Sequence, residues 1–337
     1  MRLGLSGMLA ALAAMTQAGT AFAQGVWPEE CKLTRMAELP ISFKSGHAII
    51  PAQIGGKTVA MELDTGSPVT GLTKDTIADL GLVTHLQNSR LILDIAGVVA
   101  DEYVRVSDFK LDHMERGGVY FSVLQPMRDA GGALGADVLR NYDVELDTAH
   151  GRLTLFRPHP CDDRAVYWTG TYTVIPISTV TGNGNRNGFG TVIPGRVVKG
   201  GLNKEGVLNA GHIRVPVTLD GQQVDAVIDT GAPLSLISMS EAKRLFGIDA
   251  ANTDVKAAGR LVGGAGGELQ AYSYPFRTLT MGGVSVTNPK IRIGEGQNFL
   301  QADYASLLLG MDLLQQLHLY IAYNEGKLYV SSADAGH

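Results

Sequence analysis

The feature that most constrains this chain is an internal duplication of its sequence. Residues 46–80 align without a gap to residues 211–245 at an offset of 165, and 10 of these 35 positions are identical. A second block, residues 133–156, matches residues 308–330 at an offset of 175. Because the two blocks come in the same order in both halves, we expect two copies of one structural unit within the chain.

Each copy predicts the same succession of elements. An apolar hairpin leads into an Asp-Thr-Gly turn, an amphipathic segment follows, and β-rich sequence then leads to a Leu-Gly turn. Asp137 or Asp312 stands where the N-cap of a short helix belongs, and a last hairpin turns at Gly151 or Gly326. The apolar runs are short and bounded by glycine or proline, so the chain is expected to be mostly β.

The Asp-Thr-Gly triplet occurs at residues 64–66 and again at residues 229–231. A single triplet of this kind is normally a β-turn with an Asx hydrogen bond. Two equivalent triplets instead supply two equivalent carboxyls, and two carboxyls in close contact cannot both ionise cheaply. One can then act as a base and the other as an acid, which is what peptide hydrolysis with an activated water requires. Asp64 and Asp229 are therefore the candidate catalytic residues.

The repeated pattern resembles the pepsin and retropepsin superfamily of aspartic proteases. The shared signature is an apolar residue directly before Asp-Thr-Gly, a Ser or Ala after it, then a downstream Leu-Gly turn and a short helix. The chain is similar to bacterial retropepsin-like proteins, with two tandem units over residues 38–156 and 172–331. The resemblance implies a mostly β, bilobed acid-protease fold with an internal pseudo-twofold duplication. It also implies a cleft that takes an extended peptide or protein substrate, one catalytic aspartate from each lobe, no cofactor and no metal ion.

Five neighbours of the aspartates are expected to support the dyad. They are Thr65, Gly66, Ser67, Thr230 and Gly231. The glycines let backbone amides approach the carboxyls, and the threonine hydroxyls would cross-link the two turns. The Leu-Gly turns at Gly135 and Gly310 are expected to pack behind the aspartates, where a Cβ could clash.

The two copies differ directly after the triplet, where Ser67 corresponds to Ala232. A Ser67 hydroxyl that donates to Asp64 would favour the charged form of that residue. On this hypothesis Asp64 acts mainly as the base and Asp229 mainly as the proton donor.

The expected flaps over the cleft are residues 94–101 and 261–268, whose tips are apolar and rich in glycine. Tips of this kind resemble the flaps of retropepsins, which clamp an extended peptide through backbone contacts. The tip residues expected to bind substrate are Ala96, Gly97, Val98, Gly263, Gly264 and Ala265.

The N-terminus predicts export. Residues 1–23 combine Arg2, a small apolar stretch and an Ala-Phe-Ala cleavage site, as in a secretory signal peptide; a buried helix is the alternative. No later stretch reaches the roughly 18 apolar residues of a membrane span, so a periplasmic or secreted protein is expected. In an oxidising compartment Cys31 and Cys161, which bracket the first copy, are expected to form a disulfide rather than remain free thiols.

These boundaries divide the chain into residues 1–23 as signal peptide, residues 24–160 as the first lobe and residues 161–337 as the second lobe. Because one chain holds both half-sites, it is expected to be active as a monomer. The alternatives on the same fold are a protease that has lost activity and a periplasmic protein that binds peptides without cleaving them.

Other functional classes are poorly supported. A net charge of −5 without a Lys/Arg block argues against nucleic-acid binding. The segment TGNGNRNGFG, residues 181–190, is typical of a Gly/Asn hairpin loop rather than a phosphate loop. The sequence has neither a His-Glu-x-x-His metal motif nor a G-x-S-x-G nucleophile motif. His47 and His212 repeat, and their positions suggest packing or a buried hydrogen bond.

Overall fold

The computed structural model describes eight segments of the chain. They are residues 33–86, 92–93, 99–100, 102–158, 165–179, 212–262, 268–295 and 306–334. Cys31, Cys161 and all six predicted flap-tip residues lie outside the described residues, so the disulfide and the flap contacts stay predictions.

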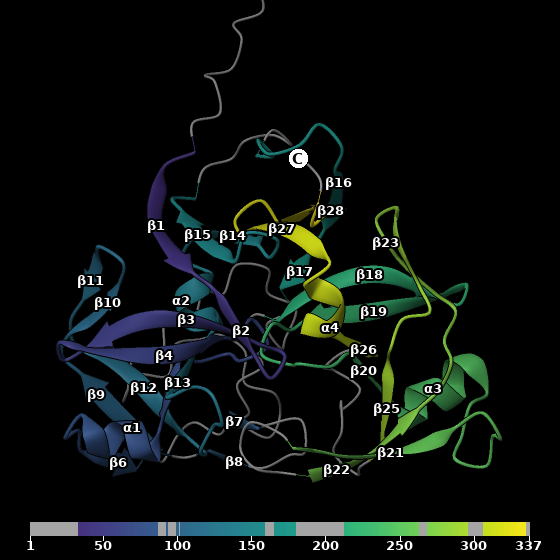
Figure 1. The fold of residues 1–337 in the computed structure, drawn as a ribbon, viewed down its shortest axis with the longest axis horizontal. Helices are drawn as coiled ribbons and strands as arrows, with labels where there is room; N and C mark the ends of the chain where they lie inside the picture. Colours follow the sequence, from purple (N-terminus) through teal and green to yellow (C-terminus); the bar gives the residue numbers. More distant parts are fainter. Residues whose placement is uncertain are drawn as a thin grey trace, which may run out of the picture. The chain divides into compact units, whose positions relative to one another are not determined.

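The first copy forms a ten-stranded sheet (Figure 1). Its order is β11-β10-β3-β4-β13-β5-β12-β9-β6, and β2 pairs with β3 beside this path. The strands are β2 (Ser42–Lys44), β3 (His47–Ile54), β4 (Lys57–Leu63), β5 (Gly71–Thr73), β6 (Thr84–Leu86), β9 (Glu102–Val106), β10 (Phe109–Leu111), β11 (Met114–Arg116), β12 (Val119–Leu124) and β13 (Gly132–Leu134). Near the expected first flap, β7 (Ile92–Leu93) pairs with β8 (Val99–Ala100).

The second copy forms a ten-stranded sheet of the same design. Its order is β24-β23-β18-β19-β26-β20-β25-β22-β21, and β17 pairs with β18. The strands are β17 (Ser178–Thr179), β18 (Ile213–Leu219), β19 (Gln222–Ile228), β20 (Leu236–Ser238), β21 (Lys256–Val262), β22 (Glu268–Ser273), β23 (Thr278–Met281), β24 (Val284–Thr287), β25 (Arg292–Glu295) and β26 (Leu307–Leu309).

The order of these strands confirms the internal duplication. Starting from β11 in one sheet and β24 in the other, the two nine-strand paths correspond position by position. In each copy a late strand, β13 or β26, inserts between the two strands that flank the Asp-Thr-Gly turn, parallel to the first and antiparallel to the second. This insertion places the Leu-Gly turn next to the Asp-Thr-Gly turn.

A third sheet contains strands from both copies. Its order is β1-β15-β14-β27-β28-β16, and the central pair joins β14 of the first copy to β27 of the second. The strands are β1 (Arg35–Pro40), β14 (Asp143–Asp147), β15 (Arg152–Phe156), β16 (Thr173–Pro176), β27 (Leu317–Ala322) and β28 (Lys327–Ser332). The predicted closing hairpins are therefore present, and they unite the two copies in one sheet.

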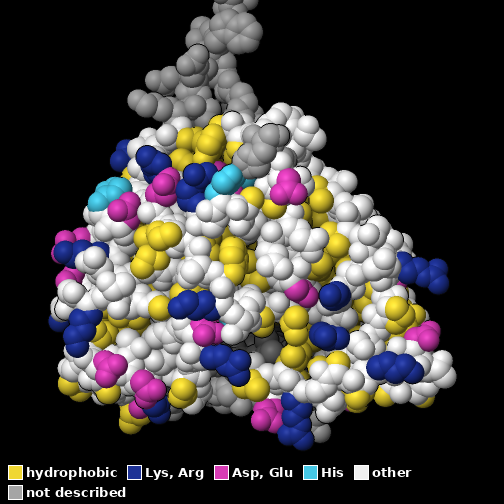
Figure 2. All heavy atoms as spheres, viewed as in Figure 1, with side chains coloured by type: hydrophobic (Ala, Val, Ile, Leu, Met, Phe, Trp, Pro, Cys, Tyr) yellow, Lys and Arg dark blue, Asp and Glu magenta, His cyan; other side chains and the backbone are white. Residues whose placement is uncertain are grey.

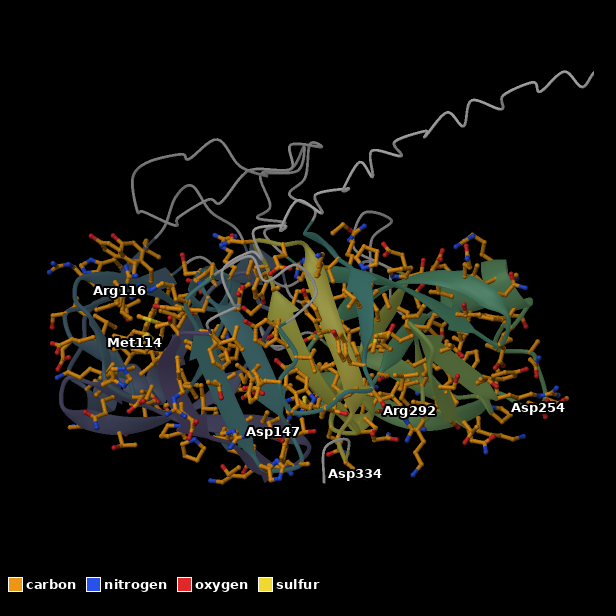
Figure 3. All side chains as sticks on the ribbon, turned by 90° about the horizontal axis from the view of Figure 1, so that it is seen from above. Met114, Arg116, Asp147, Asp254, Arg292 and Asp334 are labelled. Atoms are coloured by element: carbon orange, nitrogen blue, oxygen red, sulfur yellow. The ribbon has the colours of Figure 1, made fainter. Side chains whose placement is uncertain are left out.

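Buried charges lie at the junction of the copies in this third sheet. Glu145 on β14 is fully buried and lies 3.0 Å from the Nε2 atom of His318 on β27. Asp147, labelled in Figure 3, is 1% exposed and accepts a hydrogen bond from Arg152 at 2.6 Å. Buried carboxylates of this kind need partners, and here the partners come from both copies.

The helices are short, and local sequence explains their ends. They are α1 (Lys74–Asp79), α2 (Ala136–Leu139), α3 (Met239–Phe246) and α4 (Met311–Leu314). Thr73 and Ser238 cap α1 and α3, because each hydroxyl oxygen accepts a hydrogen bond from the backbone N–H three residues later. Gly247 ends α3 with a left-handed backbone at a φ of 68°. No helix in the part of the chain that the structure describes is long and apolar enough to span a membrane.

The sheets bury one large apolar core, and two smaller apolar clusters lie beside it among the described residues. Strand β18 alternates buried and more exposed residues, as a half-buried antiparallel strand should. The core cluster runs from Ala37 on β1 to Val330 on β28 and includes residues of both copies. On the face that Figure 2 shows, basic and acidic side chains are interspersed among apolar ones. The two copies therefore share their main apolar core.

Candidate active site

The two Asp-Thr-Gly turns begin where a buried strand ends. Leu63 ends β4 and Ile228 ends β19, and the next residue in each copy is the catalytic candidate. The backbone N–H of Asp64 donates to the carbonyl of Leu134, and that of Asp229 donates to the carbonyl of Leu309, both at 3.0 Å. The inserted strands β13 and β26 therefore fix the start of both turns in the same way.

The threonines of the two turns cross-link the copies through four hydrogen bonds. The backbone N–H of each threonine donates to the hydroxyl oxygen of the other at 3.0 Å. The Thr65 hydroxyl donates to the carbonyl of Ile228 at 2.8 Å, and the Thr230 hydroxyl donates to the carbonyl of Leu63 at 2.7 Å. Both threonines are buried, so these bonds form away from competing water. The predicted cross-link is present.

The glycines of the turns show how close the two carboxyls come to the opposite turn. A Cβ atom on Gly66 would collide with the carboxyl group of Asp229, and one on Gly231 would collide with the carboxyl of Asp64. Each aspartate therefore lies over the glycine of the other copy, in a space that only a residue without a side chain leaves free. The duplication brings both carboxyls into one site.

Backbone donors orient the carboxyls, while burial disfavours their charge. The N–H of Ser67 donates to Oδ1 of Asp64 at 2.7 Å, and the N–H of Gly231 donates to Oδ1 of Asp229 at 3.0 Å. Burial is the main cause that raises the pKa of Asp229 to about 6. Burial, followed by the nearby charge of Asp229, raises the pKa of Asp64 well above its usual range. Both carboxyls therefore keep a proton to higher pH than exposed aspartates do.

The hypothesis about the Ser67 hydroxyl is wrong. That hydroxyl donates to the carbonyl of Val69 at 2.8 Å, and a hydroxyl has one proton to donate. The contact with Asp64 comes from the Ser67 backbone, which Ala232 also has. The proposed division into Asp64 as base and Asp229 as proton donor therefore loses its support.

The prediction that Asp137 and Asp312 are N-caps is also wrong. The N-caps are Gly135 and Gly310, in extended backbone, and each aspartate lies in the first turn of its helix. The Asp137 carboxylate instead accepts hydrogen bonds from the N–H and hydroxyl of Thr70, at 2.8 and 2.7 Å. One carboxylate oxygen thus accepts two hydrogen bonds from Thr70, four residues after Gly66 of the Asp-Thr-Gly turn.

The second copy repeats this support. Ser235 donates to Asp312 through its N–H at 2.9 Å and its hydroxyl at 2.7 Å. The N–H of Gly310 in turn donates to the Ser235 hydroxyl at 3.0 Å, as that of Gly135 does to Thr70 at 3.1 Å. Sequence reasoning missed the hydroxyl residues, although both copies carry one at the equivalent position.

The Leu-Gly turns pack behind the aspartates as predicted. A Cβ on Gly135 would lie 2.9 Å from the backbone nitrogen of Thr70, and one on Gly310 would lie 2.6 Å from the carbonyl of Leu234. Distances below 3 Å to backbone atoms cannot be relieved by moving a side chain. Glycine at both positions therefore permits close packing against the segments that follow the Asp-Thr-Gly turns.

The repeated histidines make polar contacts, as their positions suggest. The Nε2 atom of His212 lies 2.7 Å from the carbonyl oxygen of Gly66, in the first catalytic turn. The Nδ1 atom of His47 lies 2.7 Å from the Oε1 atom of Glu62 on β4. His212 thus contacts the turn that carries Asp64, and His47 contacts the strand that leads into that turn.

A family model for aspartyl proteases matches the chain twice, over residues 50–138 and 215–313. The chain belongs to the aspartyl protease family. Its two matched regions are the two tandem retropepsin-like units, and each contains one Asp-Thr-Gly turn. The predicted fold class, mostly β and bilobed with a pseudo-twofold duplication, is confirmed.

Three solved structures are similar to this aspartyl protease family member. The aspartic proteinase from Irpex lacteus is 12% identical with a TM-score of 0.48, covering 89% of this chain and 98% of that one. The basic 7S globulin from soybean is 10% identical with a TM-score of 0.48, covering 91% and 96%. A retropepsin-like aspartic protease from Rickettsia conorii is 20% identical with a TM-score of 0.29, covering 38% of this chain and 97% of that one. No curated protein matches the chain in sequence.

Proposed function

We propose that the chain is an aspartic endopeptidase that hydrolyses extended peptide or protein substrates, with Asp64 and Asp229 as the catalytic dyad. The observation that supports this most directly is the position of each carboxyl over the glycine of the opposite turn. The threonine cross-link holds this arrangement, so the two carboxyls share one site.

The chemistry follows from one proton shared by two carboxyls, as in aspartic proteases generally. The charged carboxylate takes a proton from water as the water oxygen attacks the scissile carbonyl carbon. The protonated carboxyl gives its proton to the carbonyl oxygen, and later proton transfer to the amide nitrogen allows the C–N bond to break. Because burial raises the pKa of both aspartates, the one-proton state persists closer to neutral pH than in a pair of exposed carboxyls.

A broad peptide library tests this function. The purified protein is incubated with the library from acid to neutral pH, with and without pepstatin and with and without a metal chelator. We expect internal cleavage that pepstatin reduces and the chelator leaves unchanged. Peptide binding without any turnover would support the non-catalytic binding protein instead, and cleavage sensitive only to the chelator would point to a metallopeptidase.

The active unit is proposed to be a monomer. The hydrogen bonds between Thr65 and Thr230 join two turns of the same chain, so a second copy is not needed to complete the dyad. We expect the specific activity to stay constant when the enzyme is diluted over several orders of magnitude. Loss of specific activity together with a dimer-to-monomer transition in analytical ultracentrifugation would contradict this prediction.

Export and disulfide formation are proposed together. Strand β1 begins four residues after Cys31, and β15 ends five residues before Cys161. Arg35 pairs with Phe156, so the two chain segments that lead to the cysteines leave the sheet at the same end. We expect mass spectrometry of the exported protein, without reduction, to find cleavage after Ala23 and a Cys31–Cys161 crosslink. Two alkylatable thiols in the native exported protein would contradict the disulfide.

A further inference from the structure

The repeated histidines reach the catalytic turns of the opposite copy. His212, directly before β18, is 6% exposed, and its Nε2–H donates to the Gly66 carbonyl, because a carbonyl oxygen can only accept. His47, at the start of β3, interacts with the backbone of Gly231 in the second turn. Each histidine therefore contacts the Asp-Thr-Gly turn of the opposite copy.

Glu62 breaks this symmetry. It lies on β4, two residues before Asp64, and the duplication places Val227 at the equivalent position of the second copy. Glu62 is 4% exposed, and its Oε1 atom lies 2.7 Å from Nδ1 of His47. Burying a carboxylate in a strand costs free energy unless the carboxylate is paired, so the contact with His47 stabilises Glu62. The apolar side chain of Val227 in the second copy needs no such partner.

The two histidines consequently differ in charge. The hydrogen bond to Glu62 is the main cause that raises the pKa of His47, in spite of partial burial. Burial is the largest cause that lowers the pKa of His212 to about 4, and the nearby charge of Arg214 lowers it further. Near pH 6 the first copy therefore holds an ion pair beside the dyad, and the second copy holds a neutral imidazole.

The charge of Glu62 also acts on the aspartates. Burial is the largest cause that raises the pKa of Asp64 and of Asp229, and the negative charge of Glu62 raises both further. The other acidic group that acts on His47 is Asp129, whose charge also raises the histidine's pKa. The buried Oδ2 atom of Asp129 has no hydrogen-bond partner among the described residues. Glu62 and Asp129 are therefore the two acidic groups whose charges act on the His47 imidazole.

We propose that Glu62, held in place by His47, is a positioning residue that keeps the shared proton on the dyad as the pH approaches neutral. While His47 is protonated, its charge offsets that of Glu62. As His47 loses its proton, the full charge of Glu62 faces the aspartates and increases their affinity for the remaining proton. The pair thus opposes the loss of the catalytic proton in the pH range where His47 titrates. Its consequence for cleavage rests on the proposed endopeptidase function.

The first test compares the pH dependence of kcat/KM in the wild type and in the Glu62→Gln and Glu62→Val variants. Glu62→Gln keeps a hydrogen-bond acceptor for His47, and Glu62→Val installs the residue of the second copy. Removing a negative charge close to the dyad should move the basic limb of the profile down by about one pH unit. A uniform loss of rate with an unmoved limb would show a merely structural role and overturn the proposal.

Glu115→Gln is the matched control for removal of one glutamate charge. Glu115 lies on β11 in the same copy, and its side chain is 62% exposed beside Lys110. We expect this variant to keep the wild-type pH profile. A basic limb that moves equally in the Glu115 and Glu62 variants would assign the shift to net charge and contradict the proposal.

A second readout does not depend on activity. NMR titration of the imidazoles should show His47 with a midpoint above 6.5 and His212 with one well below it. In Glu62→Val the His47 midpoint should fall, and in Glu62→Gln the carboxyl resonances of Asp64 and Asp229 should titrate at lower pH. Unmoved midpoints would overturn the proposal even in an active enzyme. If these shifts occur in a protein that cleaves no peptide, only the endopeptidase function fails.

Discussion

Replacing either dyad aspartate with asparagine should lower kcat/KM for peptide cleavage by a factor of about 10,000 or more. An amide oxygen still accepts the backbone N–H of Ser67 or Gly231, so the turn keeps its geometry. The amide cannot take a proton from water, however, and it cannot give one to the carbonyl oxygen. The expected loss is therefore chemical rather than structural.

The Asp64→Asn, Asp229→Asn double variant should lose no more activity than either single variant. The two carboxyls act through one shared proton, and groups that act as a unit are strongly non-additive. The measurement is the double-mutant cycle on kcat/KM with a peptide found in the library. Two large losses that multiply would indicate independent roles and contradict a dyad, and wild-type cleavage by either single variant would remove that residue from the mechanism.

Ser67→Ala is the matched control within the same turn. The Ser67 hydroxyl donates to Val69, and the second copy already has an alanine at the equivalent position. We expect activity within a few-fold of the wild type and an unmoved pH profile. A shifted acidic limb would restore the hydroxyl as a donor to Asp64.

The duplication made much of the fold predictable from sequence. Each copy repeats the same hairpin, Asp-Thr-Gly turn and Leu-Gly turn, and such local patterns predict the order of elements along the chain, though not the order of strands in the sheets. The close approach at Gly66 and Gly231 followed from the residue type, because only glycine lets another copy's carboxyl lie against the backbone. Because both copies repeat the same elements, the two nine-strand paths correspond position by position.

What sequence could not supply is the choice among competing acceptors. The Ser67 hydroxyl could donate to a carboxylate or to a carbonyl. It donates to the Val69 carbonyl, because the backbone of the following residues turns that oxygen toward it. Asp137 has the sequence position of a cap, yet its carboxylate binds Thr70, which lies 67 residues earlier. The role of Glu62 depends on which face of β4 is buried, and the neighbouring strands determine that face.

The dyad should also make the folded protein less stable as the pH rises from about 4 to about 6. Asp229 is 8% exposed, and burial raises its folded-state pKa from 3.8 to about 6. Between these values the folded state binds more protons than the unfolded state, so the free energy of unfolding falls as pH increases. A shift of about two pKa units corresponds to about 3 kcal/mol, present below pH 4 and lost above pH 6.

Asp229→Asn should remove this loss, because an amide does not ionise. The measurement is urea unfolding of wild type and variant at several pH values, analysed as a difference, since burial also raises the pKa of Asp137 and Asp312. The variant should gain about 3 kcal/mol relative to the wild type between pH 4 and pH 7.

The pH-dependent gain in the free energy of unfolding should be larger for Asp229→Asn than for a variant that loses a surface carboxylate. Asp254→Asn removes one carboxylate from an exposed position, labelled in Figure 3, where a single charge contributes little to stability. The Asp229 charge is also one cause that raises the pKa of Asp64, so its removal relieves the second carboxyl as well. Coupling of this kind can only increase the pH-dependent gain. A difference that stays flat from pH 4 to pH 7 would mean that Asp229 ionises freely in the folded state, and the two carboxyls would then share no proton.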